Sequence, residues 1–243
     1  MCTVTIVPTS AGFRVTCNRD ERRTRPAALP PRLHTTGALR SIFPIDPQGG
    51  GTWIGVNEAG VVAALLNRND PRAAIEWRQP PKSRGLIVPR LLEHLSLDSA
   101  LGAAHGTDPK AFAPFMVILA QGTTCGMVTS DGISVSVIRQ PLRRPVMFTS
   151  SSLGDGRVRL ARQILFDRFV LTKSDVTGWL EGQRRFHRHR WRARPEISVL
   201  MTRQDARTVS RTVVDVSDRS ITLRYRPLVD KTAAGALFLG SAA

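Results

Sequence analysis

The cysteine at position 2 is the residue whose chemistry stands out in this sequence. Once Met1 is removed, Cys2 carries a thiol and a free α-amine on the same residue. The unperturbed pKa of an α-amine is about 8, so part of it is neutral at pH 7 and can accept a proton. An adjacent base of this kind is one way to activate a nucleophile. Cys2 is therefore a candidate nucleophile; the alternative is a cysteine that only fills an apolar first strand.

The residues that must position Cys2 follow from local geometry. Cys2–Pro8 and Phe13–Asn18 are two runs of β-prone residues, and Ser10-Ala11-Gly12 separates them. This pattern predicts a hairpin. A turn near residues 10 and 11 places Cys2 opposite residue 18 or 19, and so beside the tetrapeptide Asn18-Arg19-Asp20-Glu21.

The rest of the chain predicts an α+β protein with a single domain over residues 1–243. Arg25–Arg32 is Pro-rich and predicts a loop, and a turn at Gly49–Gly51 precedes a second hairpin. Strands are expected in antiparallel groups with two helical blocks between them, which favours helices packed on antiparallel sheets. The expected strands are Thr52–Asn57, Val61–Asn67, Phe115–Ala120, Cys125–Thr129, Ile133–Ile138, Val146–Thr149, Ile197–Met201, Thr212–Val216 and Ile221–Tyr225. The expected helices are Ser83–Leu95 with Ser83 as N-cap, Asp155–Val170 and Ser174–Leu180.

The composition limits the classes of function. The net charge is +16, and the basic residues are nearly all Arg. Such a charge suits phosphate or nucleic acid, but an Arg-rich genome explains it as well. The sequence contains no recognisable nucleic-acid module, and only 6% of its residues are aromatic, so we expect no nucleic-acid partner. No apolar run reaches the roughly 18 residues of a transmembrane helix, and no secretory signal is recognised. We therefore expect a cytoplasmic protein.

Two further groups of residues could bind a ligand. His187 and His189 would share a face if they lay in a strand, and could then bind a metal or haem iron. The segment Arg184–Arg194, which surrounds them, could grip an acidic ligand or lie as a solvated loop. The cysteines Cys2, Cys17 and Cys125 lack zinc-site spacing and are odd in number, which argues against a disulfide framework.

The motifs taken together resemble the NRDE family, which includes the transport and Golgi organization protein two. The resemblance is strong over residues 1–67 and weaker beyond. Members of the family have been linked to haem trafficking and to lipid or acyl-coenzyme A metabolism. The motifs that carry the resemblance are Met1-Cys2-Thr3, Asn18-Arg19-Asp20-Glu21, Gly50-Gly51-Thr52-Trp53-Ile54-Gly55, Asn57-Glu58-x-Gly60 and Ala64-Leu65-Leu66-Asn67, followed by Ser83-Arg84-Gly85-Leu86 and the stretch Ser150–Leu153.

The NRDE family is similar in turn to the cysteine N-terminal-nucleophile amidases. That resemblance implies a four-layer αββα sandwich, with Cys2 as the nucleophile and no cofactor. It implies that Asp20 hydrogen-bonds the α-amine, with Asn18 or Arg19 helping to orient it. Asn67 matches an asparagine that donates to the oxyanion.

Other positions depart from the amidase pattern. Cys17 stands where those amidases have an arginine. Arg19 could replace that charge, although we expect its side chain on the opposite face of a regular strand. Ser151 stands where they have a second oxyanion asparagine. The sequence thus supports a hydrolase of an amide or related acyl bond. The alternative is a carrier of acidic amphiphiles, such as haem or acyl-coenzyme A, on the same scaffold.

Overall fold

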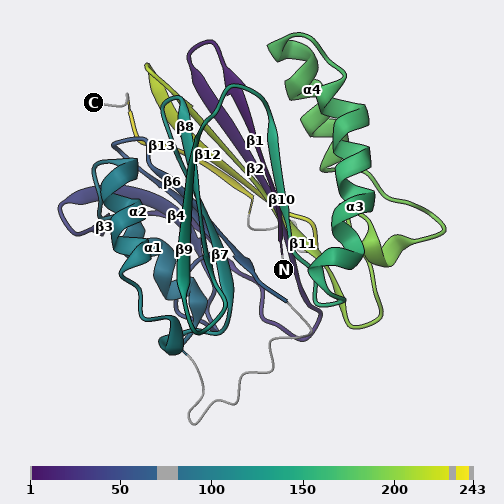
Figure 1. Ribbon diagram of the computed structural model, residues 1–243, viewed down its shortest axis with the longest axis horizontal. Helices are drawn as coiled ribbons and strands as arrows, with labels where there is room; N and C mark the ends of the chain where they lie inside the picture. The colour runs from purple at the N-terminus through teal and green to yellow at the C-terminus, as the bar shows by residue number, and fades with distance from the viewer. Residues whose placement is uncertain (1, 70–81, 230–233, 241–243) are drawn as a thin grey trace.

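Two antiparallel sheets face each other at the centre of the molecule, and helices cover the outer side of each (Figure 1). The computed structural model describes residues 2–69, 82–229 and 234–240. In this part of the chain, the N-terminal sheet has the order β10-β1-β2-β11-β12-β13. Its strands are β10 (Val146–Thr149), β1 (Cys2–Thr9), β2 (Gly12–Arg22), β11 (Ala206–Ser217), β12 (Ser220–Pro227) and β13 (Gly235–Phe238).

The second sheet runs in sequence order from β3 to β9. Its strands are β3 (Leu29–Thr36), β4 (Leu39–Ile45), β5 (Ile54–Asn57), β6 (Val62–Asn67), β7 (Phe115–Gln121), β8 (Thr124–Ser130) and β9 (Val135–Pro141). Helices α1 (Ile87–Leu91) and α2 (Leu97–His105) cover this sheet. Helices α3 (Asp155–Phe166) and α4 (Val176–Phe186) cover the N-terminal sheet, with a π-helical turn η3 (Asp167–Leu171) between them. The layers are therefore α, β, β and α, as expected.

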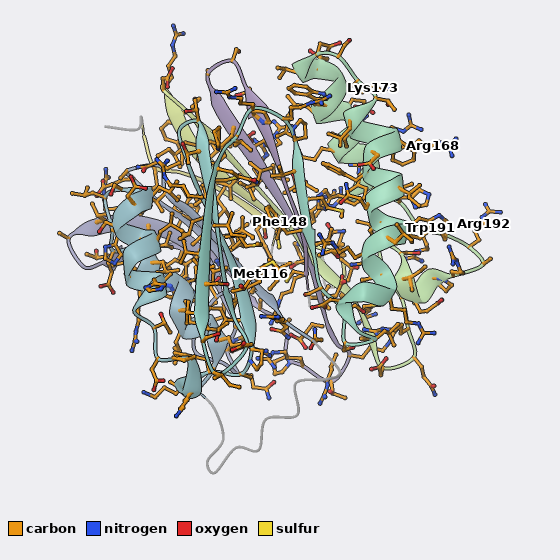
Figure 2. All side chains as sticks on the ribbon, in the orientation of Figure 1. Met116, Phe148, Arg168, Lys173, Trp191 and Arg192 are labelled. Carbon is orange, nitrogen blue, oxygen red and sulfur yellow. The ribbon has the colours of Figure 1, made fainter. Side chains whose placement is uncertain are left out.

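Strand β1 is buried on both faces because it lies inside this sandwich. Val4 and Ile6 contribute to the apolar core between the sheets. Thr3 and Thr5 point the other way and are also fully buried. Because side chains alternate along a strand, those of β1 point in turn into the core between the sheets and into the layer between this sheet and its helices. Figure 2 shows Met116 and Phe148 in the layer between the two sheets, where they pack against the same core as Val4.

Several predicted boundaries were wrong. The predicted loop Arg25–Arg32 ends within β3, and the helix expected over Ser83–Leu95 is a 3-10 turn (Arg84–Leu86) followed by the short α1. Ser83 makes no capping hydrogen bond. Strands β4 and β13 and helix α2 were not predicted.

The strand expected over Ile197–Met201 was also wrong. This segment follows a 3-10 turn (Pro195–Ile197), and its carbonyl groups accept hydrogen bonds from side chains. Arg162 donates to the carbonyl oxygens of Ile197 and Ser198, and Asn18 donates to that of Val199. The apolar residues of this segment suggested a strand, but side chains take the place of a partner strand as hydrogen-bond donors. No helix in the described ranges is long and apolar enough to cross a bilayer.

Candidate active site around Cys2

The β1–β2 hairpin places Cys2 directly opposite Arg19. Paired residues of an antiparallel ladder project to the same face, so Arg19 shares the face of Cys2. The expectation that Arg19 points away was wrong. Residues 17 and 19 are two apart on one strand, and alternation returns the chain to the same face. Along the tetrapeptide, Arg19 and Glu21 therefore face the space between the sheets, while Asn18 and Asp20 face α3 and α4.

Cys2 lies in the wall of a cavity of about 600 Å³. Arg19 stands beside it, and its guanidinium lies 4.2 Å above the centre of the Trp53 ring. Asn67, the last residue of β6, lines the same cavity. The side chain of Asn67 makes no hydrogen bond within the described part of the chain, so its amide is available to a ligand. The structure thus brings Cys2, Arg19 and Asn67 together.

The Cys2 thiol is buried, yet its pKa is lowered. Hydrogen bonding with the Cys17 thiol lowers the pKa of Cys2 most, and burial opposes it. The positive charge at the N-terminus and, less strongly, that of Arg19 lower the pKa further, while the charge of Asp20 raises it. The same contact and burial raise the pKa of Cys17 well above its ordinary value. Cys17 therefore stays protonated and donates to the Cys2 sulfur.

Asp20 lies on the opposite face of β2 from the Cys2 thiol and is 1% exposed. Its carboxylate accepts a hydrogen bond of 2.6 Å from the Thr208 hydroxyl. The buried guanidinium of Arg162 lies 3.9 Å away. Burial raises the pKa of Asp20, and Arg162 opposes that shift. Asp20 is therefore a buried acid whose charge depends on Arg162.

Asn18 connects the hairpin to the helical layer. Its Nδ2 donates to the carbonyl oxygens of His187 and Val199, and its Oδ1 lies 3.1 Å from Nδ1 of His187. The other ring nitrogen of His187 lies 2.7 Å from the Thr5 hydroxyl. All of the amide's atoms are thus engaged away from the cavity, and Asn18 holds the strand rather than facing Cys2.

Ser150 is the contact of Cys2 that sequence reasoning missed. The backbone nitrogen of Cys2 donates to the Ser150 hydroxyl at 3.3 Å, and the Ser150 nitrogen donates to the Cys2 carbonyl at 3.0 Å. The hydroxyl of Ser151 instead accepts a hydrogen bond from the nitrogen of Leu153. The serine run after a predicted strand was the only signal available in the sequence.

Asp155 fastens the two chain segments that end at this site. One carboxylate oxygen accepts from the Ser151 nitrogen at 2.7 Å, and the other accepts from the Asn69 nitrogen at 2.9 Å. Ser150 immediately precedes Ser151, and Asn67 lies two residues before Asn69. The first residue of α3 therefore fixes the distance between the strand ends that carry them.

Two glycines explain why the motifs around Trp53 and Arg84 lie together. A Cβ atom on Gly51 would lie 2.3 Å from the carbonyl carbon and oxygen of Gly85. The nitrogen of Thr52 donates to that same carbonyl oxygen at 3.0 Å. Only glycine allows this approach. The contact places both Trp53 and Arg84 on the cavity beside Cys2.

The sequence matches the family described as Transport and Golgi organisation 2 over residues 1–169. The chain belongs to this family. No functionally curated protein matches it.

Solved structures of two amidases share the fold. An N-acylethanolamine-hydrolyzing acid amidase ortholog from Caenorhabditis elegans has a TM-score of 0.60 at 13% identity, over 87% of this chain and 92% of its own. A variant of the conjugated bile acid hydrolase from Clostridium perfringens has a TM-score of 0.58 at 12% identity, over 98% and 92%. At such identities the likeness shows the fold alone, that of the N-terminal-nucleophile hydrolases.

The family member's basic segment lies away from this cavity. Figure 2 shows Trp191 and Arg192 at the outer side of the helical layer with Arg168, far from the space between the sheets. His187 uses both ring nitrogens inside the protein, and the ring of His189 packs on Trp191 at 4.8 Å. The described residues contain no cluster of three metal-ligating side chains. His187 and His189 were considered as a pair in a strand, but His187 instead lies at the C-terminal end of α4.

Two arginines of β11 lie near the tetrapeptide without reaching the cavity. Arg211 pairs with Asn18 across β2 and β11, and its charge contributes to the lowered pKa of His187, after burial. Arg207 pairs with Glu21. Neither arginine lines the cavity that contains Cys2.

Proposed function

We propose that this protein is a cysteine N-terminal-nucleophile hydrolase of an amide or related acyl bond. One observation carries the proposal. A cysteine that processing can make N-terminal lines a cavity, and its thiol pKa is lowered, first by the Cys17 thiol and then by the positive charge at the N-terminus. The proposal includes a single domain over residues 1–243, a cytoplasmic location and no cofactor.

Formation of an acyl-enzyme would proceed from the residues around the cavity. After removal of Met1, the α-amine of Cys2 takes the thiol proton, and the sulfur attacks the carbonyl carbon of the substrate. The carbonyl oxygen becomes an oxyanion, to which the Asn67 amide donates. The C–N bond then breaks, and the departing amine takes its proton from the α-ammonium. A water molecule, deprotonated by the α-amine, hydrolyses the thioester and releases the acid.

The remaining residues of the proposed site position the amine. Ser150 already contacts the nitrogen of Cys2, and removal of Met1 makes that nitrogen the amine. Asp20 lies buried behind the strand and supplies a negative charge that stabilises the protonated amine. Asn18 holds β2 against the helical layer, and Arg19 favours the thiolate. These are the roles we assign to the tetrapeptide motif.

Mass spectrometry tests the proposal directly. Intact-mass measurement of the purified protein should show loss of Met1. Incubation with activated amides and thioesters should then leave an acyl adduct on Cys2, with a burst of product. Cys2→Ala should abolish both the adduct and the burst, while Cys125→Ala, which removes a cysteine outside the cavity, should keep them. A retained Met1 would exclude the self-activated mechanism.

A carrier of haem or of acyl-coenzyme A-like amphiphiles is the second candidate. It is favoured by the two positions that differ from the amidases, because Cys17 is a neutral thiol and the Ser151 hydroxyl is engaged by the nitrogen of Leu153. A carrier should bind such a ligand without turnover, and Cys2→Ala should leave most of the affinity. Binding that survives Cys2→Ala, together with no adduct across amides and thioesters, would establish the carrier.

A further inference from the structure

The cavity beside Cys2 has an excess of positive charge. Five cationic side chains line it, against two carboxylates. The cations are Arg19, Arg22, Arg25, Lys82 and Arg84, and the carboxylates are Glu21 and Asp46. A concave site with charges of one sign concentrates ligands of the opposite sign.

Both carboxylates form ion pairs with the same two arginines. One oxygen of Asp46 accepts from Arg19 at 2.8 Å and from Arg25 at 2.7 and 2.9 Å. Glu21 lies 3.5 Å from Arg19 and 3.6 Å from Arg25. Arg19 and Arg25 are thus neutralised inside the protein. The charge excess of the cavity comes from Arg22, Lys82 and Arg84.

Arg84 is the most confined of these three cations. Its guanidinium donates to a neutral acceptor, the carbonyl oxygen of Pro114, at 2.9 Å, and no carboxylate in the described ranges pairs with it. Burial lowers the pKa of Arg84. A guanidinium has five N–H donors, so most of those of Arg84 have no acceptor from the described protein. A partly desolvated cation in this state is stabilised by an anion.

Trp53 supplies an independent observation in the same cavity. It is 5% exposed, and its indole nitrogen has no hydrogen-bond partner among the described residues. An indole N–H can only donate, and a buried donor without an acceptor costs free energy. Trp53 and Arg84 both line the cavity, and an acceptor-only group bound between them would satisfy both kinds of donor.

We infer that this cavity binds a carboxylate or phosphate group of the substrate, held by Arg84 and the Trp53 indole, with Lys82 and Arg22 attracting it at the mouth. The substrate class is then an amide or acyl compound that carries an anion away from the bond that is cut. The identity of that bond rests on the proposed function; binding of the anion does not.

Two alkylating reagents of nearly equal size test the charge preference. Iodoacetate is an anion and iodoacetamide is neutral, and their rates at Cys2 are each divided by their rates with free cysteine. The normalised preference for iodoacetate should be about tenfold or more in the wild type, equivalent to roughly 1.4 kcal/mol. Arg84→Gln should remove most of it and leave the iodoacetamide rate unchanged. Arg143→Gln, an exposed change outside the cavity, should keep it. No preference in the wild type, or one that Arg84→Gln does not alter, would overturn the inference.

A second measurement is independent of the reactivity of Cys2. The four tryptophans give few indole N–H signals in NMR spectra, and Trp53→Phe assigns that of Trp53. Titration with inorganic phosphate, and separately with succinate, should shift this signal saturably in both wild type and Cys2→Ala. Arg84→Gln should weaken the effect, and the tighter of the two probes identifies phosphate or carboxylate. An unreactive Cys2 with a saturable shift would reject the proposed nucleophile and keep the anion site. A signal that neither anion moves would reject the site.

Discussion

The side chains of Cys2 and Cys17 meet diagonally across the β1–β2 ladder, and the second thiol controls the acidity of the first. Their pKa values move in opposite directions, downward for Cys2 and upward for Cys17, because one thiol donates and the other accepts. Cys17, which marks a departure from the amidase pattern, is therefore the residue whose removal should change Cys2 most directly.

The first prediction concerns this pair. Cys17→Ala removes the donor that stabilises the Cys2 thiolate, so the pH profile for alkylation of Cys2 should move to higher pH. Peptide mapping after a short exposure to iodoacetamide gives the rates of the three cysteines separately. In the wild type, Cys2 should react fastest near neutral pH. Cys125→Ala, on β8, is the matched control and should leave the profile of Cys2 in place. Equal rates for all three cysteines would show that Cys2 is not activated.

The second prediction separates the site from the fold at Asp20. Burial raises the pKa of Asp20, so its ionised form adds little to stability at neutral pH. Asp20→Asn keeps the size of the side chain and a hydrogen-bonding oxygen for Thr208. The free energy of unfolding should change by about 1 kcal/mol or less, while the rate of acyl-enzyme formation falls at least about tenfold. Urea denaturation and burst kinetics measure the two effects. A collapse of stability without a selective kinetic change would make Asp20 a structural residue.

The sequence predicted the relation between Cys2 and Arg19 because a short hairpin leaves little freedom of register. The hairpin from Thr52 to Asn67 was similarly local, and it brought Asn67 to the cavity. The face of Arg19 was misjudged although alternation determines it. The contacts that the sequence did not predict are those between residues far apart in the chain.

Ser150 contacts Cys2 across 148 residues, and no local pattern indicates that contact. Arg162 is another example. An arginine in the middle of an amphipathic helix predicts a solvated side chain, yet this one is 1% exposed and donates to Thr3 and Thr149. Its buried surroundings are created by β1, β2, β10 and the segment around Ile197 and Ser198, which lie far apart in the sequence. The same long-range contacts explain why Ile197–Met201 resembled a strand.

The third prediction uses His187 as a pH-sensitive support of the fold. Burial first, and then the charges of Arg211 and Arg162, hold its pKa well below the ordinary value of 6.5. Because the pKa of this histidine is lower in the folded protein, the unfolded chain is protonated at pH values where the folded chain is not. The stability that depends on the neutral ring is therefore complete above about pH 6.5 and is lost as the pH falls below it, by up to about 1.4 kcal/mol per pH unit.

Urea denaturation at pH 7.5 and 5.5 measures this loss. His187→Gln keeps hydrogen-bonding atoms toward Asn18 and Thr5 but cannot titrate, so the difference between the two pH values should shrink. His105→Gln, an exposed change at the end of α2, should behave like the wild type. An unchanged difference in His187→Gln would assign the pH dependence to other groups.

The fourth prediction concerns the clamp made by Asp155. Asp155→Ala removes the acceptors for the nitrogens of Ser151 and Asn69, and we expect a loss of about 1 to 3 kcal/mol in the free energy of unfolding. The strand ends that carry Ser150 and Asn67 should also separate, so acyl-enzyme formation should slow. Asp155→Asn should restore part of both. Full activity in Asp155→Ala would show that the strand ends are held by other contacts.

The last prediction tests the oxyanion role of Asn67. An oxyanion donor acts in the transition state, and removal of one such donor typically slows catalysis by about 100- to 1000-fold. Asn67→Ala should therefore lower kcat in this range with little change in KM, and the iodoacetamide rate at Cys2 should stay the same because alkylation forms no oxyanion. Asn69→Ala is the matched control. Its side chain lines a different cavity, with Met116 and Phe148, and its contact with Asp155 comes from the backbone, which the substitution keeps. Equal losses in the two variants, or a parallel fall in alkylation, would mean that Asn67 supports the structure of the site and does not stabilise the transition state.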